Sequence, residues 1–218
     1  MDKEKIANGI RLVLEGIGEL QISEEHYKET PRRVAEMCEE IFSGLYIEPP
    51  KLKIFQEDVD QMIVSDNIPF YSFCAHHLLP FRGYARIGYI PRDGRIVGVS
   101  KLARVLDYYA RRPTVQEIIT NRVADFLFNH PELKPLGVGV LLKASHDCEI
   151  IRGVKKEGCT MMTSALRGEF FRKEVREEFR TIEKEEKERI LEGIREMIMP
   201  KEEKEEEICL LYTSDAAD

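Results

Sequence analysis

The sequence contains no run of about 18 or more apolar residues, so it offers no candidate for a membrane-spanning helix. The first five residues lack the apolar block and small-residue cleavage site of a secretory signal. Basic residues are not in excess, because 33 Lys and Arg stand against 40 Asp and Glu, a net charge of −7. A nucleic-acid-binding protein typically shows the opposite balance. These absences predict a soluble, cytoplasmic protein that binds neither membranes nor nucleic acids.

The cysteines do not form an even set that could be paired off. An odd number in a chain without a secretory signal argues against a disulfide framework. Metal binding or burial as free thiols are the better interpretations of the five cysteines, which are Cys38, Cys74, Cys148, Cys159 and Cys209.

What is present is enough apolar material for a sizeable core. The chain has 218 residues, of which 43% are hydrophobic, so we expect one domain or at most two. The charge is uneven, since residues 167–218 hold 17 acidic and 11 basic residues, a net of −6. The body of the chain is therefore nearly neutral, and the acidic excess lies at the C-terminal end.

The spacing of apolar residues predicts an alternation of helices and strands. A helix is expected over 4–19, and Thr30, as an N-cap before Pro31, predicts a second helix that starts there and stops near Gly44. Short apolar runs broken by turn residues predict antiparallel strands at 70–73, 84–90 and 96–99, then helices at 101–111 and 114–129, then strands at 137–145 and 159–166. This order predicts an α+β domain with paired helices on one face of an antiparallel sheet.

The same pattern suggests four regions along the chain. We expect an N-terminal helical region over 1–50, a catalytic domain over 51–172, a long charged C-terminal helix over 173–200 and a charged tail over 201–218. The tail is predicted to be disordered. Its last residues match nothing before them in composition and suggest a cloning or sequencing read-through.

The segment Cys74-Ala75-His76-His77 contains a Cys-x-x-His pair that could chelate one zinc ion. Residues three apart on a regular strand point to opposite faces, so the chain must bend here, and residues 78–80 allow such a bend. The two histidines then diverge. One can bind a metal while the other faces the space where a reaction would occur.

A second cluster, His146-Asp147-Cys148 with Arg152 close behind, could supply a third ligand through Cys148. Three protein ligands leave one tetrahedral position for water, which is the catalytic arrangement of zinc. The alternative is that a single Cys-x-x-His arises by chance and that these cysteines are buried in the core. The residues by themselves leave both interpretations open.

Ser100, Lys101 and Arg104 follow a predicted strand and open a predicted helix. Free N–H groups at a helix start favour phosphate, and the two cations add to that preference. The alternative is that Ser100 is an ordinary N-cap and that both basic residues are solvated.

Gln116 and Glu117 open the next predicted helix. A carboxylate here can accept two N–H bonds from the edge of guanine, a pattern that adenine does not supply. The alternative is a capping box made by Thr114 and Glu117.

Together, these segments resemble the GTP cyclohydrolase I family, and the resemblance covers roughly residues 6–179. The family's Cys-Glu-His-His, Ser-Lys-x-x-Arg and Arg-Pro-x-x-Gln-Glu motifs correspond to residues 74–77, 100–104 and 112–117. Its His-x-Cys with a following Arg-Gly, its Thr-Ser-Ala-Leu-Arg-Gly run and its Thr-Pro-x-Arg motif correspond to residues 146–153, 163–168 and 30–33. Several motifs in the right order favour the functional interpretations over the local alternatives.

The resemblance implies a fold, an assembly and an activity. The fold would be the tunnelling fold, assembled into pentamers and then into a homodecamer with active sites between subunits. The activity would be zinc-dependent opening of the imidazole ring of GTP at C8, giving formate and 7,8-dihydroneopterin triphosphate, the first step of tetrahydrofolate and pterin biosynthesis.

The resemblance also implies a role for each matching residue. Cys74, His77 and Cys148 would hold zinc, and His76 and His146 would form the proton-transfer pair. Gln116 and Glu117 would fix the guanine. The ribose and triphosphate would be bound by Ser100, Lys101, Arg104, Arg152 and, from a neighbouring subunit, Arg33.

Two positions depart from the family pattern. Ala75 stands where the family usually has glutamate, and Glu149 stands where methionine is frequent. Both bear on reaction rate and metal affinity. Two alternative functions remain, a related enzyme that opens GTP to a different product and a non-catalytic GTP-binding regulatory oligomer. The presence of both His76 and His146 speaks against the second alternative.

Overall fold

The computed structural model describes residues 1–18 and 23–181, and the chain divides into two compact units, residues 1–173 and 174–218. Residues 173–181 are helical. The remainder of the helix predicted over 173–200, and all of the tail over 201–218, lie outside the described residues. Within the described part, no helix combines the length and the hydropathy needed to cross a membrane.

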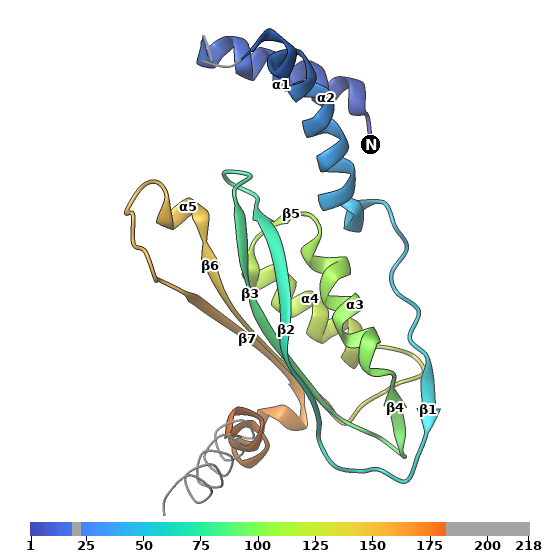
Figure 1. Ribbon diagram of the computed structural model, residues 1–218. Helices are drawn as coiled ribbons and strands as arrows, with labels where there is room; N and C mark the ends of the chain where they lie inside the picture. Colours follow the sequence, from blue (N-terminus) through green and yellow to red (C-terminus); the bar gives the residue numbers. More distant parts are fainter. Residues whose placement is uncertain (19–22, 182–218) are drawn as a thin grey trace, which may run out of the picture. The chain divides into compact units, whose positions relative to one another are not determined.

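A five-stranded sheet with the order β5-β2-β3-β6-β7 forms the centre of the first unit (Figure 1). Four strands are antiparallel neighbours, namely β2 (Ile63–Cys74), β3 (Pro80–Ile90), β6 (Gly137–His146) and β7 (Met161–Gly168), and β7 is followed by the short helix η2 (Glu169–Phe171). The two-residue strand β5 (Pro113–Thr114) pairs in parallel with the end of β2. This parallel pair was not predicted, because two residues are too few to show an alternating pattern.

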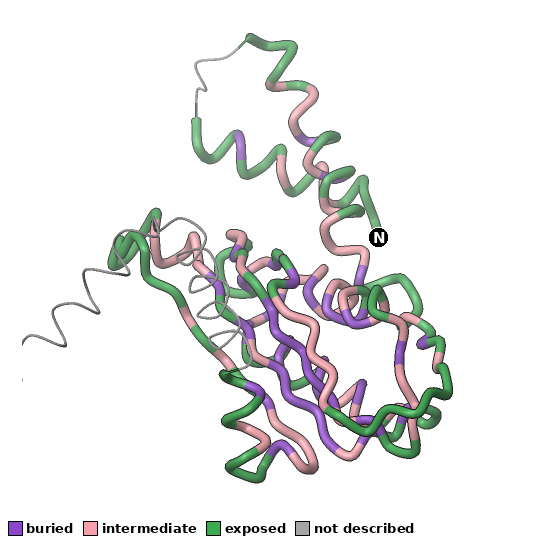
Figure 2. The backbone as a smooth tube through the Cα atoms, turned by 60° about the horizontal axis from the view of Figure 1, so that its bottom comes forward, coloured by how far each residue is buried: buried purple, intermediate pink, exposed green. Residues whose placement is uncertain are grey.

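Helices α3 (Val99–Ala110) and α4 (Gln116–Phe128) pack on one face of this sheet (Figure 1). Each helix turns an apolar stripe towards the sheet, and every second residue of the central strands packs against one of these stripes. Buried residues therefore run along the central strands (Figure 2). The core includes Phe81, Ile87, Val105, Leu106, Ile119, Val123, Val140 and Leu142. The predicted α+β class, with helices packed on a sheet, is confirmed.

A separate ribbon of two short strands lies beside this layer pair. Strand β1 (Ile54–Gln56) pairs antiparallel with β4 (Arg95–Val97). The buried Tyr89 hydroxyl accepts a 3.0 Å hydrogen bond from the Val97 backbone N–H, which ties the ribbon to strand β3.

The N-terminal helices are α1 (Lys3–Ile17) and α2 (Glu24–Ile41), followed by the 3-10 turn η1 (Ser43–Leu45). The prediction that the second helix starts at Thr30-Pro31 is wrong, because α2 begins directly after Ser23 and Pro31 lies inside it. Pro31 has no N–H to donate within the helix. The hydroxyl of the preceding Thr30 donates to the carbonyl oxygen of His26, one turn earlier in the helix, at 2.9 Å. A Thr-Pro pair therefore does not mark a start when a polar helical turn precedes it.

Candidate metal centre and active site

Three potential metal ligands meet at one end of the sheet. Cys74 is the last residue of β2, His77 lies in the turn that follows, and Cys148 lies in the one-turn helix α5 (Asp147–Ile150) after β6. Strands β2 and β6 both run antiparallel to β3 and flank it, so their C-terminal ends lie at the same end of the sheet with β3 between them (Figure 1). The ligand atoms of the three residues all lie within 4.8 Å of one another.

The turn after β2 has the bend that the sequence predicted. The Leu78 N–H donates to the Cys74 carbonyl oxygen at 2.8 Å, and the Cys74 N–H donates to the Leu79 carbonyl oxygen at 2.8 Å. Leu78 itself adopts a left-handed conformation with φ of 54°. This tight turn places Nδ1 of His77 at 3.7 Å and Nδ1 of His76 at 3.6 Å from Sγ of Cys74.

The donor set fits a zinc ion. Zinc–sulfur bonds of about 2.3 Å and zinc–nitrogen bonds of about 2.0–2.1 Å in a tetrahedron place neighbouring ligand atoms about 3.5–3.8 Å apart. The Cys74–His77 separation of 3.7 Å falls in this range. Burial raises the pKa of the Cys148 thiol, and the adjacent Cys74 thiol raises it further. A bound divalent cation favours the thiolate and would offset both effects.

His146, the last residue of β6, lies beside this cluster with its ring held on two sides. The ring stacks on Phe81 with a centroid distance of 4.4 Å and an interplanar angle of 8°. Its Nε2 lies 2.9 Å from Oε1 of Gln116. Burial lowers the pKa of His146, and nearby carboxylates, Glu149 first among them, oppose that effect. The environment therefore favours a neutral imidazole in a fixed orientation.

Gln116 and Glu117, at the start of α4, point in different directions. Gln116 is fully buried, and its amide nitrogen lies 3.2 Å from the carbonyl oxygens of Leu142 and Met161 and 3.0 Å from the Thr163 hydroxyl. Glu117 is exposed. Only the second of these side chains has its polar group directed to solvent.

The capping box considered for this helix is not formed. The N-cap of α4 is Val115, which makes no side-chain cap. Thr114 instead lies in β5, where it pairs with Cys74 of β2. This pairing places the start of α4 next to the cluster of Cys74, His77 and Cys148. It is extended by a hydrogen bond from the Ala75 N–H to the Thr114 carbonyl oxygen at 3.0 Å.

The residues predicted to bind phosphate are spread over three elements. Ser100, Lys101 and Arg104 lie in the first turns of α3, whose N-cap is Gly98, so the interpretation of Ser100 as an N-cap is wrong. Arg33 is exposed on α2. Among the described residues, no hydrogen bond or ion pair joins these four to the cysteine–histidine cluster. Arg152 differs, because its Nη1 contacts Nε2 of His77.

Comparison with known proteins decides the family. The family model described as GTP cyclohydrolase I matches residues 6–184. The chain belongs to the GTP cyclohydrolase I family.

Its relatives within the GTP cyclohydrolase I family match over most of their length. A protein of Pelotomaculum thermopropionicum named GTP cyclohydrolase 1 is 49% identical over 176 residues, which is 80% of this chain and 92% of the relative. Proteins of the same name from Thermoanaerobacter pseudethanolicus and Clostridioides difficile are 51% and 50% identical, and each alignment covers 78% of this chain and 90% of the relative. The part of the chain that matches the GTP cyclohydrolase I family contains every predicted site residue.

Three residues around His146 and Gln116 have side-chain contacts that the sequence of this GTP cyclohydrolase I family member did not indicate. Phe81 stacks on the imidazole, and Thr120 and Thr163 complete the hydrogen bonds around Gln116. One signal was available, since Gln116 and Thr120 are four residues apart and share a helix face. Thr163 lies in a family motif to which no role had been given.

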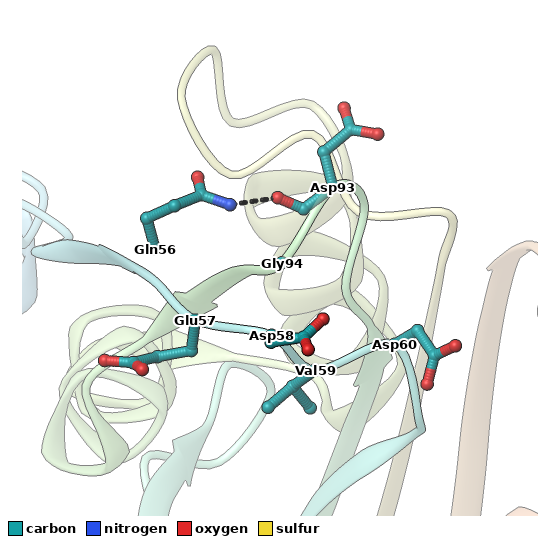
Figure 3. A pocket seen from close by; sticks show the side chains of 7 residues that line it. All are labelled: Gln56, Glu57, Asp58, Val59, Asp60, Asp93 and Gly94. Atoms are coloured by element: carbon teal, nitrogen blue, oxygen red, sulfur yellow. Dashed lines mark hydrogen bonds between the residues drawn. The ribbon is translucent and has the colours of Figure 1, made fainter.

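A separate hollow of about 810 Å³ lies between the turn after β3 and the segment after β1 (Figure 3). The amide nitrogen of Gln56 donates to the Asp93 carbonyl oxygen there. The lining residues are Gln56, Glu57, Asp58, Val59, Asp60, Asp93 and Gly94. None of them is a predicted site residue, and four carboxylates make the hollow unfavourable for a triphosphate.

Proposed function

We propose that the chain hydrolyses the imidazole ring of GTP in a zinc-dependent reaction. Two waters break the two bonds to C8 and release that carbon as formate. Rearrangement of the ribose and closure of a new ring then release one water and give 7,8-dihydroneopterin triphosphate, so that one water is consumed overall. This reaction begins tetrahydrofolate and pterin biosynthesis. The observation that carries this proposal is the meeting of Cys74, His77 and Cys148 beside His146 in a chain of the GTP cyclohydrolase I family.

The mechanism assigns separate tasks to the metal ligands and the histidines. Zinc, when bound by Cys74, His77 and Cys148, would leave one position for water and lower the pKa of that water to about 7. The chain's other residues move protons. His146 and His76 would transfer a proton to the imidazole nitrogen of GTP that loses its bond to C8, and so assist the departure of formate.

Recognition of GTP would use the exposed polar groups around the cluster. Glu117 would accept N–H bonds from the guanine edge. Arg152, which already contacts His77, would bind the ribose or the triphosphate. The remaining anion-binding groups would be Ser100, Lys101 and Arg104 at the start of α3, with Arg33 supplied by a neighbouring subunit.

Replacing Glu117 with alanine is expected to raise KM for GTP by about 10–100-fold, because hydrogen bonds to a charged group contribute about 1.5–3 kcal/mol. Steady-state kinetics with varied GTP measures the change. Glu132→Ala, at an exposed glutamate in the segment after α4, is the control and should leave KM unchanged. An unaltered KM in Glu117→Ala would contradict the assignment of the guanine site.

The assembly that we propose is the tunnelling-fold homodecamer of two pentamers, in the cytoplasm. Two features support it. Among the described strands, β7 is the last in the sheet order, so its outer edge offers unpaired backbone groups to another strand. Large apolar side chains are also exposed, among them Leu12 and Ile17 on α1 and Tyr84 and Met162 on the sheet face away from α3 and α4. A second copy of the chain would cover both features.

The direct test of the activity is an assay of formate release by purified zinc-loaded protein supplied with GTP, coupled to mass analysis of the product. The proposal expects formate and a product with the mass of dihydroneopterin triphosphate in equimolar amounts. ATP should yield no formate. A ring-opened product of another mass would indicate the related enzyme. GTP binding without formate would indicate the regulatory oligomer and would contradict the proposal.

A further inference from the structure

The ring of His146 has a protein partner at one nitrogen. Nε2 lies 2.9 Å from Oε1 of Gln116, and within the described residues the structure gives Nδ1 no hydrogen-bond partner. A neutral imidazole carries its hydrogen on one nitrogen only, and the other nitrogen is then an acceptor. Which nitrogen carries the hydrogen decides which of them can exchange a proton with a substrate.

The surroundings of Gln116 fix the orientation of its amide. The amide nitrogen lies 3.2 Å from two backbone carbonyl oxygens, those of Leu142 and Met161. A carbonyl oxygen can only accept, so the group that faces it must donate. Rotating the amide by half a turn would place Oε1 against both carbonyl oxygens in a fully buried position, where unpaired acceptors are costly.

Two hydroxyl groups complete the arrangement and are consistent with it. Thr120 donates its single hydrogen to the backbone carbonyl oxygen of Gln116 at 2.8 Å. In the 2.6 Å contact between the two hydroxyls, Thr163 must therefore be the donor. The lone pairs of Thr163 then remain free to accept from the Gln116 amide nitrogen at 3.0 Å. The two hydrogens of the Gln116 amide nitrogen then face three acceptors, and Oε1 of Gln116 is left facing His146 as an acceptor.

We infer that Gln116 is a positioning residue that holds His146 with a hydrogen on Nε2, so that Nδ1 is the nitrogen that takes up a proton and passes it to the substrate. Stacking on Phe81 holds the ring plane while the hydrogen bond holds its rotation. The inference rests on the proposed function, and it gives Gln116 a different task from the guanine contact that the family resemblance implied. Gln116 acts through His146 and not on GTP.

The tautomer can be read without any activity measurement. In zinc-loaded protein labelled with 15N-histidine, at about pH 8 where imidazole is uncharged, His146 should show a hydrogen-bearing Nε2 and an acceptor Nδ1. Its signals are identified by their absence from a His146→Asn protein. In Gln116→Met protein, the form with hydrogen on Nδ1 should appear. A wild-type His146 with its hydrogen on Nδ1 overturns the inference.

Kinetics separate positioning from guanine binding. Gln116→Met should lower kcat by about 10–100-fold, by analogy with the loss that follows removal of the hydrogen-bond partner of a metal-binding histidine, while KM for GTP changes by less than about two-fold. Gln56→Met makes the same substitution at the amide in the acidic hollow (Figure 3) and should alter neither constant. A raised KM with unchanged kcat in Gln116→Met overturns the inference. An inactive wild-type protein contradicts the proposed function instead, and the tautomer remains measurable in it.

Discussion

Formate release from GTP is expected to fall by about 10²–10⁴-fold when His146 is replaced by alanine, because general acid–base groups contribute rate enhancements of that size. GTP binding should persist, since the groups proposed to hold the guanine and the phosphates lie on other elements. The measurement pairs kcat from the formate assay with GTP affinity from calorimetry. Zinc content should also stay at one ion per chain, because His146 is not a proposed ligand.

The control for this experiment is His26→Ala. His26 is exposed on α2 and has no role in the proposed chemistry, so its removal should leave kcat unchanged. If His146→Ala instead released formate at the wild-type rate, the proton-transfer role assigned to His146 would be lost. If it failed to bind GTP, His146 would be part of the binding site and not of the proton-transfer pair.

Replacing Cys148 with serine is expected to remove zinc and to lower formate release by more than about 100-fold, a larger loss than that caused by changes to the outer partners of metal ligands. A serine hydroxyl stays protonated at neutral pH, whereas zinc binds the thiolate of cysteine. Elemental analysis of dialysed protein measures the metal, and the formate assay measures the rate.

Cys159→Ser is the matched control for Cys148→Ser. Cys159 is a free, exposed thiol in the same segment of chain, but it is outside the three-residue cluster. It should keep both zinc and activity. Retention of a full complement of zinc by Cys148→Ser would contradict the proposed ligand set.

The metal ligands could be proposed from the sequence because each half of the cluster has a recognisable local pattern. The Cys-x-x-His spacing required a bend, and the turn with left-handed Leu78 supplies it. Cys148 was placed correctly after a strand. The meeting of the two halves follows from β2 and β6 flanking β3, a pairing over long range that no local pattern shows. The family resemblance filled that gap.

The role of Gln116 was beyond local reasoning for the same reason. Its sequence neighbours suggested either a capping box or a guanine contact. The pairing of Thr114 with Cys74 sets where α4 begins, and this turns Gln116 inward. The partners of its amide come from β6 and β7, about 26 to 47 residues further along the chain. A buried polar network of this kind becomes visible only when the strands are in register.

The central claim is that two thiolates and one imidazole share a single zinc ion. X-ray absorption at the zinc edge of the zinc-loaded protein tests it most directly. The account predicts two sulfur neighbours at about 2.3 Å and one histidine nitrogen at about 2.0–2.1 Å, with one further light atom in the remaining position. Fewer than two sulfur atoms bound directly to the zinc ion would contradict the proposed ligand set.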